Sequence, residues 1–160
     1  MASNGGIIMG LDCYIVHSND REKPFTAEDD PRIKDINLCG GMLSGHGADG
    51  SFRGKWYEPL MDELMGDDGI WHMPEDSFGV LPEWLKEQAQ ALADLLHAVE
   101  SDAKEQDLLI DDGKTTLLPE TIIYQTHHGS PYEYTYQEVK DLELLLRCAS
   151  ERGAVMLCWW

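Results

Sequence analysis

The chain has 160 residues, of which 12 are Lys or Arg and 30 are Asp or Glu, so its formal net charge is −18. Such a surface repels nucleic-acid phosphates and anionic lipid headgroups, which argues against direct nucleic-acid binding and against peripheral membrane binding. The length suits one domain with a hydrophobic core, and we expect residues 1–160 to form it. The acidic surface serves solubility and also favours basic protein surfaces as partners.

The ends of the chain and its cysteines bear on where the protein works. No apolar stretch approaches the ~20 residues that span a bilayer, and the opening MASNGGIIMGLDCYIV lacks the basic segment of a signal peptide. The cysteines are Cys13, Cys39, Cys148 and Cys158, and none forms a C-x-x-C pair. We expect a cytoplasmic protein with reduced thiols that act as small hydrophobic side chains. Met9 is an alternative start, which would make residues 1–8 a dispensable extension.

The N-terminal part predicts a strand and a series of loops. The β-branched segment 7–16 favours a first strand, which ends at the polar HSND. Residues 21–32 carry two prolines and many charges, which predicts a surface loop. Residues 33–39 favour a short strand. The next segment, 40–54, is dense in glycine, which predicts a long loop with unusual backbone angles or a close backbone approach.

Two helices are predicted in the middle of the chain. PLMDELMG favours a short helix, with Pro59 at its first position and Gly66 at its end. A long helix begins at Pro82 and fades near Glu105. Its apolar residues recur at helical spacing on one face and are Leu85, Ala89, Leu92, Leu96 and Val99. His97 lies off this face, so we expect it to be exposed.

The C-terminal part predicts strands on either side of a last helix. Residues 108–118 favour two short strands around an Asp-Gly turn, and 121–126 a further strand followed by the loop HHGSPYEY. Thr135 and Glu138 form a capping box that opens the helix, because each side chain can satisfy a free backbone N–H. The apolar face of the helix comprises Val139, Leu142, Leu146 and Ala149. Gly153 ends the helix, and AVMLCWW favours an interior strand.

This order of elements predicts an α+β fold. We expect a small, partly mixed sheet with two main helices packed on one face, and a long glycine-rich loop beside it. No internal repeat and no low-complexity segment interrupts the pattern.

The glycine-rich loop contains a motif that resembles a dinucleotide fingerprint. Gly45 to Gly50, GHGADG, matches G-x-G-x-x-G, but that motif requires a helix to open directly from the loop. Here the first predicted helix begins only at Pro59, so we favour a chance match to the dinucleotide motif. A phosphate-binding P-loop also fails, because Asp49 stands where the first glycine should be and Trp56 replaces Ser or Thr.

SFRGKWYEP places two cations beside two aromatic residues. Arg53 and Lys55, with Trp56 and Tyr57, are suited to hold an anion or a planar group. The alternative, which we favour slightly, is that Phe52 and Trp56 pack into the core while the cations face solvent.

Asp12 places a carboxylate inside the first predicted strand. By alternation it shares a face with Tyr14 and Val16. If only the opposite face is covered, Asp12 lies at a half-open surface. If Asp12 is shielded, it requires a cation or donors, and Arg53 is the partner we expect. A shielded pair would mark a pocket, whereas an unpaired, shielded Asp12 would be a candidate acid or base.

THHGSPYEY concentrates further polar groups. His127 and His128 are adjacent, and adjacent residues of an extended chain point in opposite directions, so they rarely bind one ion together. His46 or His72 could complete a metal site, but no metal-binding spacing is present. Ser130 lacks the surroundings of a nucleophile elbow. We therefore predict no metal and no cofactor.

MGLDCYI, from Met9 to Ile15, resembles the opening of small bacterial and phage proteins that begin MGLD-x-Y, and SFRGKWY is similar to a segment that such proteins could share. The resemblance covers short stretches only. It implies no activity and transfers no catalytic residue; it favours Met9 as the start and a cytoplasmic protein of cellular or phage origin.

Two hypotheses about function follow. The first is a non-enzymatic binding or regulatory module with a basic protein surface as its partner, including the special case of a nucleic-acid mimic. The second is a small enzyme or anionic-ligand binder whose site lies between loop 40–57 and loop 126–136. The candidate ligand-binding residues are Asp12, Arg53, Lys55, Tyr57, His127 and His128. We favour the first because no complete catalytic motif is present.

Overall fold

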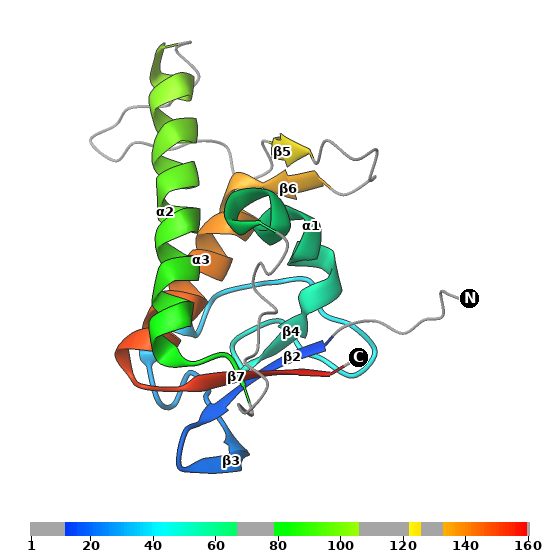
Figure 1. Ribbon diagram of the computed structural model, residues 1–160. Helices are drawn as coiled ribbons and strands as arrows, with labels where there is room; N and C mark the ends of the chain where they lie inside the picture. Colours follow the sequence, from blue (N-terminus) through cyan, green and yellow to red (C-terminus); the bar gives the residue numbers. More distant parts are fainter. Residues whose placement is uncertain (1–11, 67–78, 106–121, 126–132, 160) are drawn as a thin grey trace.

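The computed structural model describes residues 12–66, 79–105, 122–125 and 133–159 (Figure 1). Within them the chain has the predicted α+β architecture. Helices pack over one face of a small sheet, and a separate two-stranded hairpin lies beside the helices.

The sheet is built around one central strand, β2 (Asp12–His17). Strand β7 (Val155–Trp159) pairs with β2 over its first five residues. The other edge of β2 is shared by β4 (Ser51–Arg53) and β3 (Asp20–Pro24), which pair with its beginning and its end respectively. Every one of these pairings is antiparallel. The central strand is hydrogen-bonded along both edges, because β7 pairs with one edge and β3 and β4 pair with the other.

The sheet is not the partly mixed one predicted from the sequence. The described strands pair only in antiparallel fashion. The connection between β2 and β3 is a two-residue turn at 18–19, and a connection this short can only join antiparallel strands. Strand β7 also pairs with β2 in antiparallel fashion. The chain reverses direction before it at Gly153, which follows the last helix and adopts a positive φ of 72°.

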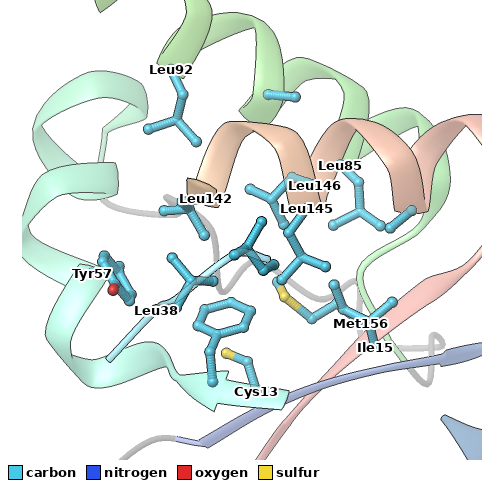
Figure 2. Close-up of a cluster of buried hydrophobic side chains, with 14 of the residues drawn as sticks. Cys13, Ile15, Leu38, Tyr57, Leu85, Leu92, Leu142, Leu145, Leu146 and Met156 are labelled. Carbon is cyan, nitrogen blue, oxygen red and sulfur yellow. The ribbon is translucent and has the colours of Figure 1, made fainter. Parts of the chain in front are cut away.

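The helices are α1 (Gly54–Met65), α2 (Pro82–Glu105) and α3 (Tyr136–Glu151). Helices α2 and α3 pack along one another above the sheet (Figure 1). The long helix has the predicted bounds, and His97 is exposed as expected. The buried faces of both helices meet the sheet residues Cys13 and Ile15 in one core (Figure 2).

The hairpin supports the start of α3. Strand β5 (Ile122–Gln125) was predicted, whereas β6 (Glu133–Thr135) falls in a segment expected to be a loop. Thr135 ends β6 and is also the N-cap of α3, where its hydroxyl accepts a hydrogen bond from the Glu138 N–H at 3.1 Å. The predicted strands at 7–11 and 108–118 lie outside the described residues.

Three further expectations differ from the structure. The predicted loop 21–32 contains β3 and the short 3-10 helix η1 (Pro31–Ile33), and residues 33–39 form no strand. Helix α1 begins at Gly54, so Pro59 lies inside it rather than at its first position. Proline there removes one backbone hydrogen bond, but contacts of the preceding turn with α3 hold the helix in place.

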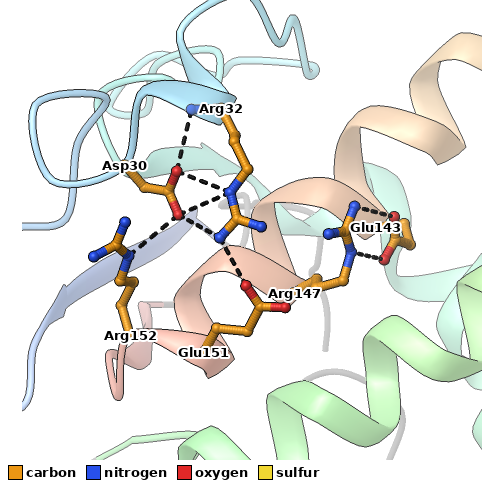
Figure 3. A network of polar contacts seen from close by, with 6 residues as sticks. All are labelled: Asp30, Arg32, Glu143, Arg147, Glu151 and Arg152. Carbon is orange, nitrogen blue, oxygen red and sulfur yellow. Dashed lines mark hydrogen bonds and ion pairs between the residues drawn. The ribbon is translucent and has the colours of Figure 1, made fainter.

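A buried carboxylate ties η1 to the end of α3 (Figure 3). Asp30 is 1% exposed, accepts hydrogen bonds from the Arg32 side chain and backbone N–H, and lies 3.4 Å from the Arg152 guanidinium. Arg32 also reaches Glu151 at 2.7 Å. The hydrogen bonds from Arg32 hold the pKa of Asp30 well below its ordinary value of 3.8.

We expect Asp30→Asn to lower the free energy of unfolding by about 1–3 kcal/mol, because a buried acceptor of charge-assisted hydrogen bonds is lost. Since the pKa of Asp30 is lower in the folded state than in the unfolded state, this contribution is present at neutral pH. It begins to decrease as the pH falls below the ordinary Asp range and is fully lost only below the lower, folded-state pKa, so at pH 3 it should be reduced but not abolished. Urea unfolding at pH 7 and at pH 3 measures both effects.

The matched control is Glu151→Gln, which removes the other acidic partner of Arg32 at a half-exposed position. Its cost should stay below about 1 kcal/mol at either pH. Equal losses in the two variants, or a loss in Asp30→Asn that is unchanged at pH 3, would contradict the role assigned to Asp30.

Candidate functional site

Asp12 is shielded from solvent on the face of β2 that points away from the helices. Its residue is 7% exposed, and alternation places Cys13 and Ile15 on the opposite, core-facing side. Arg53 of β4 is its direct partner in the register of the two strands, so the two side chains share one face. The first strand therefore has both faces covered, although helices cover only one of them.

The cover on the Asp12 face is the glycine-rich loop. The Tyr14 hydroxyl donates a hydrogen bond to the Leu43 carbonyl at 2.8 Å, and the Gly41 N–H donates one to Ser44 Oγ at 2.8 Å. A Cβ at Gly41 would lie 2.9 Å from Arg53 Nη1 and 3.0 Å from Asp12 Oδ1. Glycine at this position lets the loop backbone lie against both charged groups.

The expected direct ion pair between Asp12 and Arg53 is not formed among the described residues. Asp12 Oδ1 is buried without a hydrogen-bond partner, and no acidic side chain of the described chain pairs with the half-buried Arg53 guanidinium. The loop backbone at Gly41 lies against both groups, which explains why the two side chains do not close on each other. The arrangement leaves a cation and an acceptor side by side with unused hydrogen-bonding capacity.

The same cation stands at the start of a helix. Arg53 is the N-cap of α1, makes no side-chain capping bond, and no acidic residue occupies the first turn. Free backbone N–H groups and the helix dipole both favour negative charge at such a position. Lys55 in the first turn is exposed and adds a second cation.

A buried polar cluster holds the first turn of α1 against α3. Glu138 Oε1 accepts hydrogen bonds from Trp56 Nε1 and from the Tyr57 hydroxyl, both at 2.9 Å. The Tyr57 oxygen in turn accepts the Cys39 N–H at 2.7 Å. The Glu138 carboxylate therefore binds α1 instead of closing the predicted capping box. Of the two hydrogen bonds of that box, the one from the Glu138 N–H to the Thr135 hydroxyl is formed.

These contacts decide the role of the aromatic residues. Tyr57 is fully buried, and its hydroxyl both donates and accepts within the protein, so it supports the site rather than contacting a ligand. Burial, followed by the neighbouring Glu138 charge, raises the pKa of Tyr57. Burial also raises the pKa of Glu138, against the lowering effect of its hydrogen-bond donors.

The GHGADG motif serves the loop itself. Gly47 and Gly50 have φ values of 104° and 86°, a region that favours glycine. A Cβ at Gly50 would lie 2.4 Å from the Phe25 carbonyl oxygen. Strand β4, rather than a helix, follows directly at Ser51. The geometry required for binding a dinucleotide at a helix start is therefore not the one built here.

His127 and His128 lie outside the described residues, and of the expected second loop only residues 133–136 are described, which form β6 and the start of α3. No cluster of three or more metal-ligating side chains occurs in the described ranges. In the same ranges, no helix combines the length and the apolar character that crossing a membrane requires.

Two hollows lie away from this junction and had no signal in the sequence. One of about 650 Å³ runs between α2 and α3, past Ala89 and Glu143. Another of about 330 Å³ lies beside the His17–Asp29 pair. The acids and cations at their walls include groups already paired, such as Glu143 with Arg147, so the volumes by themselves do not indicate a ligand. The junction of β4 and α1 remains the candidate site.

Comparison with known proteins adds no relative: no family model, curated protein or solved structure matches the chain.

The Glu138 cluster yields a test of how the site is supported. Glu138→Ala should lower the free energy of unfolding by about 3 kcal/mol, because the donors Trp56 and Tyr57 lose a charged acceptor. Glu138→Gln should cost about 1 kcal/mol, since the amide oxygen still accepts. Chemical denaturation measures both. Glu133→Ala, at an exposed position of β6, is the control and should stay within about 0.5 kcal/mol; an equal loss there would contradict the assignment.

Proposed function

We propose that the protein is a non-enzymatic binding module that holds a small anion, or the anionic group of a larger molecule, at the junction of β4 and α1. The observation that carries the proposal is the Arg53 guanidinium. It is half-buried at an uncapped helix start and has no acidic partner among the described residues, in a chain with 30 carboxylates. A guanidinium fork suits a carboxylate or a phosphate, which it can bind through two parallel hydrogen bonds.

Asp12 narrows the class of anion. Its buried Oδ1 has no hydrogen-bond partner within the described part of the chain and lies near Arg53 Nη1, since both atoms approach the same point beside Gly41, so an anion that also carries a donor can satisfy both groups. Inorganic phosphate at neutral pH keeps a P–OH donor, as does a phosphate monoester in its monoanionic form. Sulfate is of similar size but carries no proton at this pH, so its oxygens would meet the Asp12 carboxylate without a hydrogen between them.

Isothermal titration with inorganic phosphate at constant ionic strength tests the role of Arg53. The wild-type chain should bind phosphate, and Arg53→Gln should weaken binding about tenfold or more, because a charge-assisted hydrogen-bonding group is removed. Arg21→Gln makes the same charge change on exposed β3 and should bind as the wild type does. Equal affinities in the Arg53 and Arg21 variants would overturn the proposal.

A comparison of phosphate with sulfate tests the role of Asp12. The wild-type chain should prefer phosphate, and Asp12→Asn should reduce the preference by strengthening sulfate binding, since the amide removes the repulsion and can present its NH₂ group. Gly41→Ala should weaken both anions, because the added methyl group would lie where Arg53 Nη1 now approaches the loop. If Asp12→Asn leaves the ratio of the two affinities unchanged, the assigned selectivity is wrong.

A further inference from the structure

Cys13 and Cys158 face each other across the two strands of the sheet. They are direct partners in the register of β2 and β7, and their sulfur atoms are 3.9 Å apart. In the described chain both are free thiols, although 145 positions separate them in the sequence. The question is whether the strand geometry permits a covalent bond between them.

The backbone hydrogen bonds identify the kind of pair. Ile15, on the same side of β2 as Cys13, directs its N–H and its carbonyl toward Gly50 and Phe25, away from β7. Its own partner on β7, Met156, exchanges both hydrogen bonds with Val80 on the far side. Alternate residues repeat this pattern, so Cys13 and Cys158 form a non-hydrogen-bonded pair. Such pairs bring Cα atoms to ~4.5 Å, which lies within the span of disulfides.

The two thiols differ in their access to solvent. Cys13 is fully buried, whereas Cys158 is half-buried, so a small water-borne oxidant reaches Cys158 first. The Cys13 thiol is the donor in the S–H···S contact with Cys158. Burial, followed by this contact, raises the pKa of Cys13 well above its ordinary value, which keeps it in the protonated form.

We propose that Cys13 and Cys158 form a peroxide-sensitive dithiol that closes into a disulfide between β2 and β7. In the first step the Cys158 sulfur attacks one oxygen of hydrogen peroxide and becomes a sulfenic acid, and the other oxygen leaves as water. In the second step the Cys13 sulfur displaces the sulfenic hydroxyl, which takes the Cys13 proton and leaves as a second water. Two thiols and one peroxide thus yield one disulfide and two waters.

The proposal does not rest on anion binding, because the cysteines and the candidate site occupy opposite faces of β2. Cys13 points into the core, whereas Asp12 points to the glycine-rich loop. The remaining cysteines make useful controls, since neither lies on β2 or β7: Cys39 precedes the loop, and Cys148 is in α3 near Asp30. Burial raises the pKa of Cys148 to about 11, so Cys148, like Cys13, is a poor first target for peroxide.

The test exposes the folded, full-length protein to a small excess of hydrogen peroxide and then alkylates the remaining thiols after unfolding. Mass spectrometry of the intact chain and of its non-reduced peptides should show two alkylated cysteines of four and a peptide pair joined through Cys13 and Cys158. Dithiothreitol added before alkylation should restore all four thiols. A disulfide between other cysteines, four unreacted thiols, or oxygen added to Cys158 with Cys13 still alkylated would each overturn the proposal.

Variants separate this pair from general oxidation. Cys158→Ser, at the half-buried position, should leave three alkylated thiols after peroxide, because Cys13 has lost its partner. Cys39→Ser and Cys148→Ser each keep the Cys13–Cys158 pair, so peroxide should reduce their alkylatable thiols from three to one. Cys13→Ser changes a fully buried residue, so Cys158→Ser, with circular dichroism to verify folding, is the deciding variant. Loss of two thiols in Cys158→Ser would refute the assignment.

Discussion

The structure depends on the complete coverage of β2. Its core face packs under the helices, and its two edges are hydrogen-bonded by β7 on one side and by β4 and β3 on the other. The neighbouring loops are also hydrogen-bonded to β2 at Ile15. Its N–H donates to the Gly50 carbonyl at 2.6 Å, and its carbonyl accepts the Phe25 N–H. A side chain at Gly50 would collide with Phe25, so the glycine-rich segment is part of the sheet rather than an appendage. Every group attached to β2 is thereby fixed in position.

This coverage explains how a carboxylate is tolerated in the first strand. The loop closes over Asp12, and Arg53 lies opposite, so the negative charge has a nearby cation without a direct contact. The net charge of −18 repels anions at long range, but salt screens it over ~8 Å at physiological ionic strength. At the junction of β4 and α1 the nearest fixed charges therefore dominate: Arg53, Lys55 and the helix start are positive, and the Asp12 carboxylate beside Arg53 is negative.

Local patterns predicted the regular elements well and their tertiary roles less well. The apolar stripe from Leu85 to Leu96 predicted α2 correctly, because a helix with one core-facing side repeats its apolar residues at helical spacing. The start of α1 was misplaced because Pro59 is a local signal, whereas the hydrogen bonds of Trp56 and Tyr57 to Glu138 join residues about eighty positions apart. Arg53 was expected as the partner of a shielded Asp12, and β4 brings it to the same face of the sheet, but the backbone at Gly41 beside the two groups has no signature beyond the glycine itself.

The cysteines show why strand register carries information that composition does not. Taken singly, Cys13 and Cys158 are small residues in apolar runs, and the absence of C-x-x-C gives no reason to pair them. Once β2 and β7 are in register, the same two residues become neighbours at the class of position where strands approach most closely. A shift of the register by one residue would turn Cys158 to the opposite face and separate the sulfur atoms. Since Val80 and the buried Met156 bind each other on the far edge of β7, such a shift would also break that contact, and the core itself holds the two thiols together.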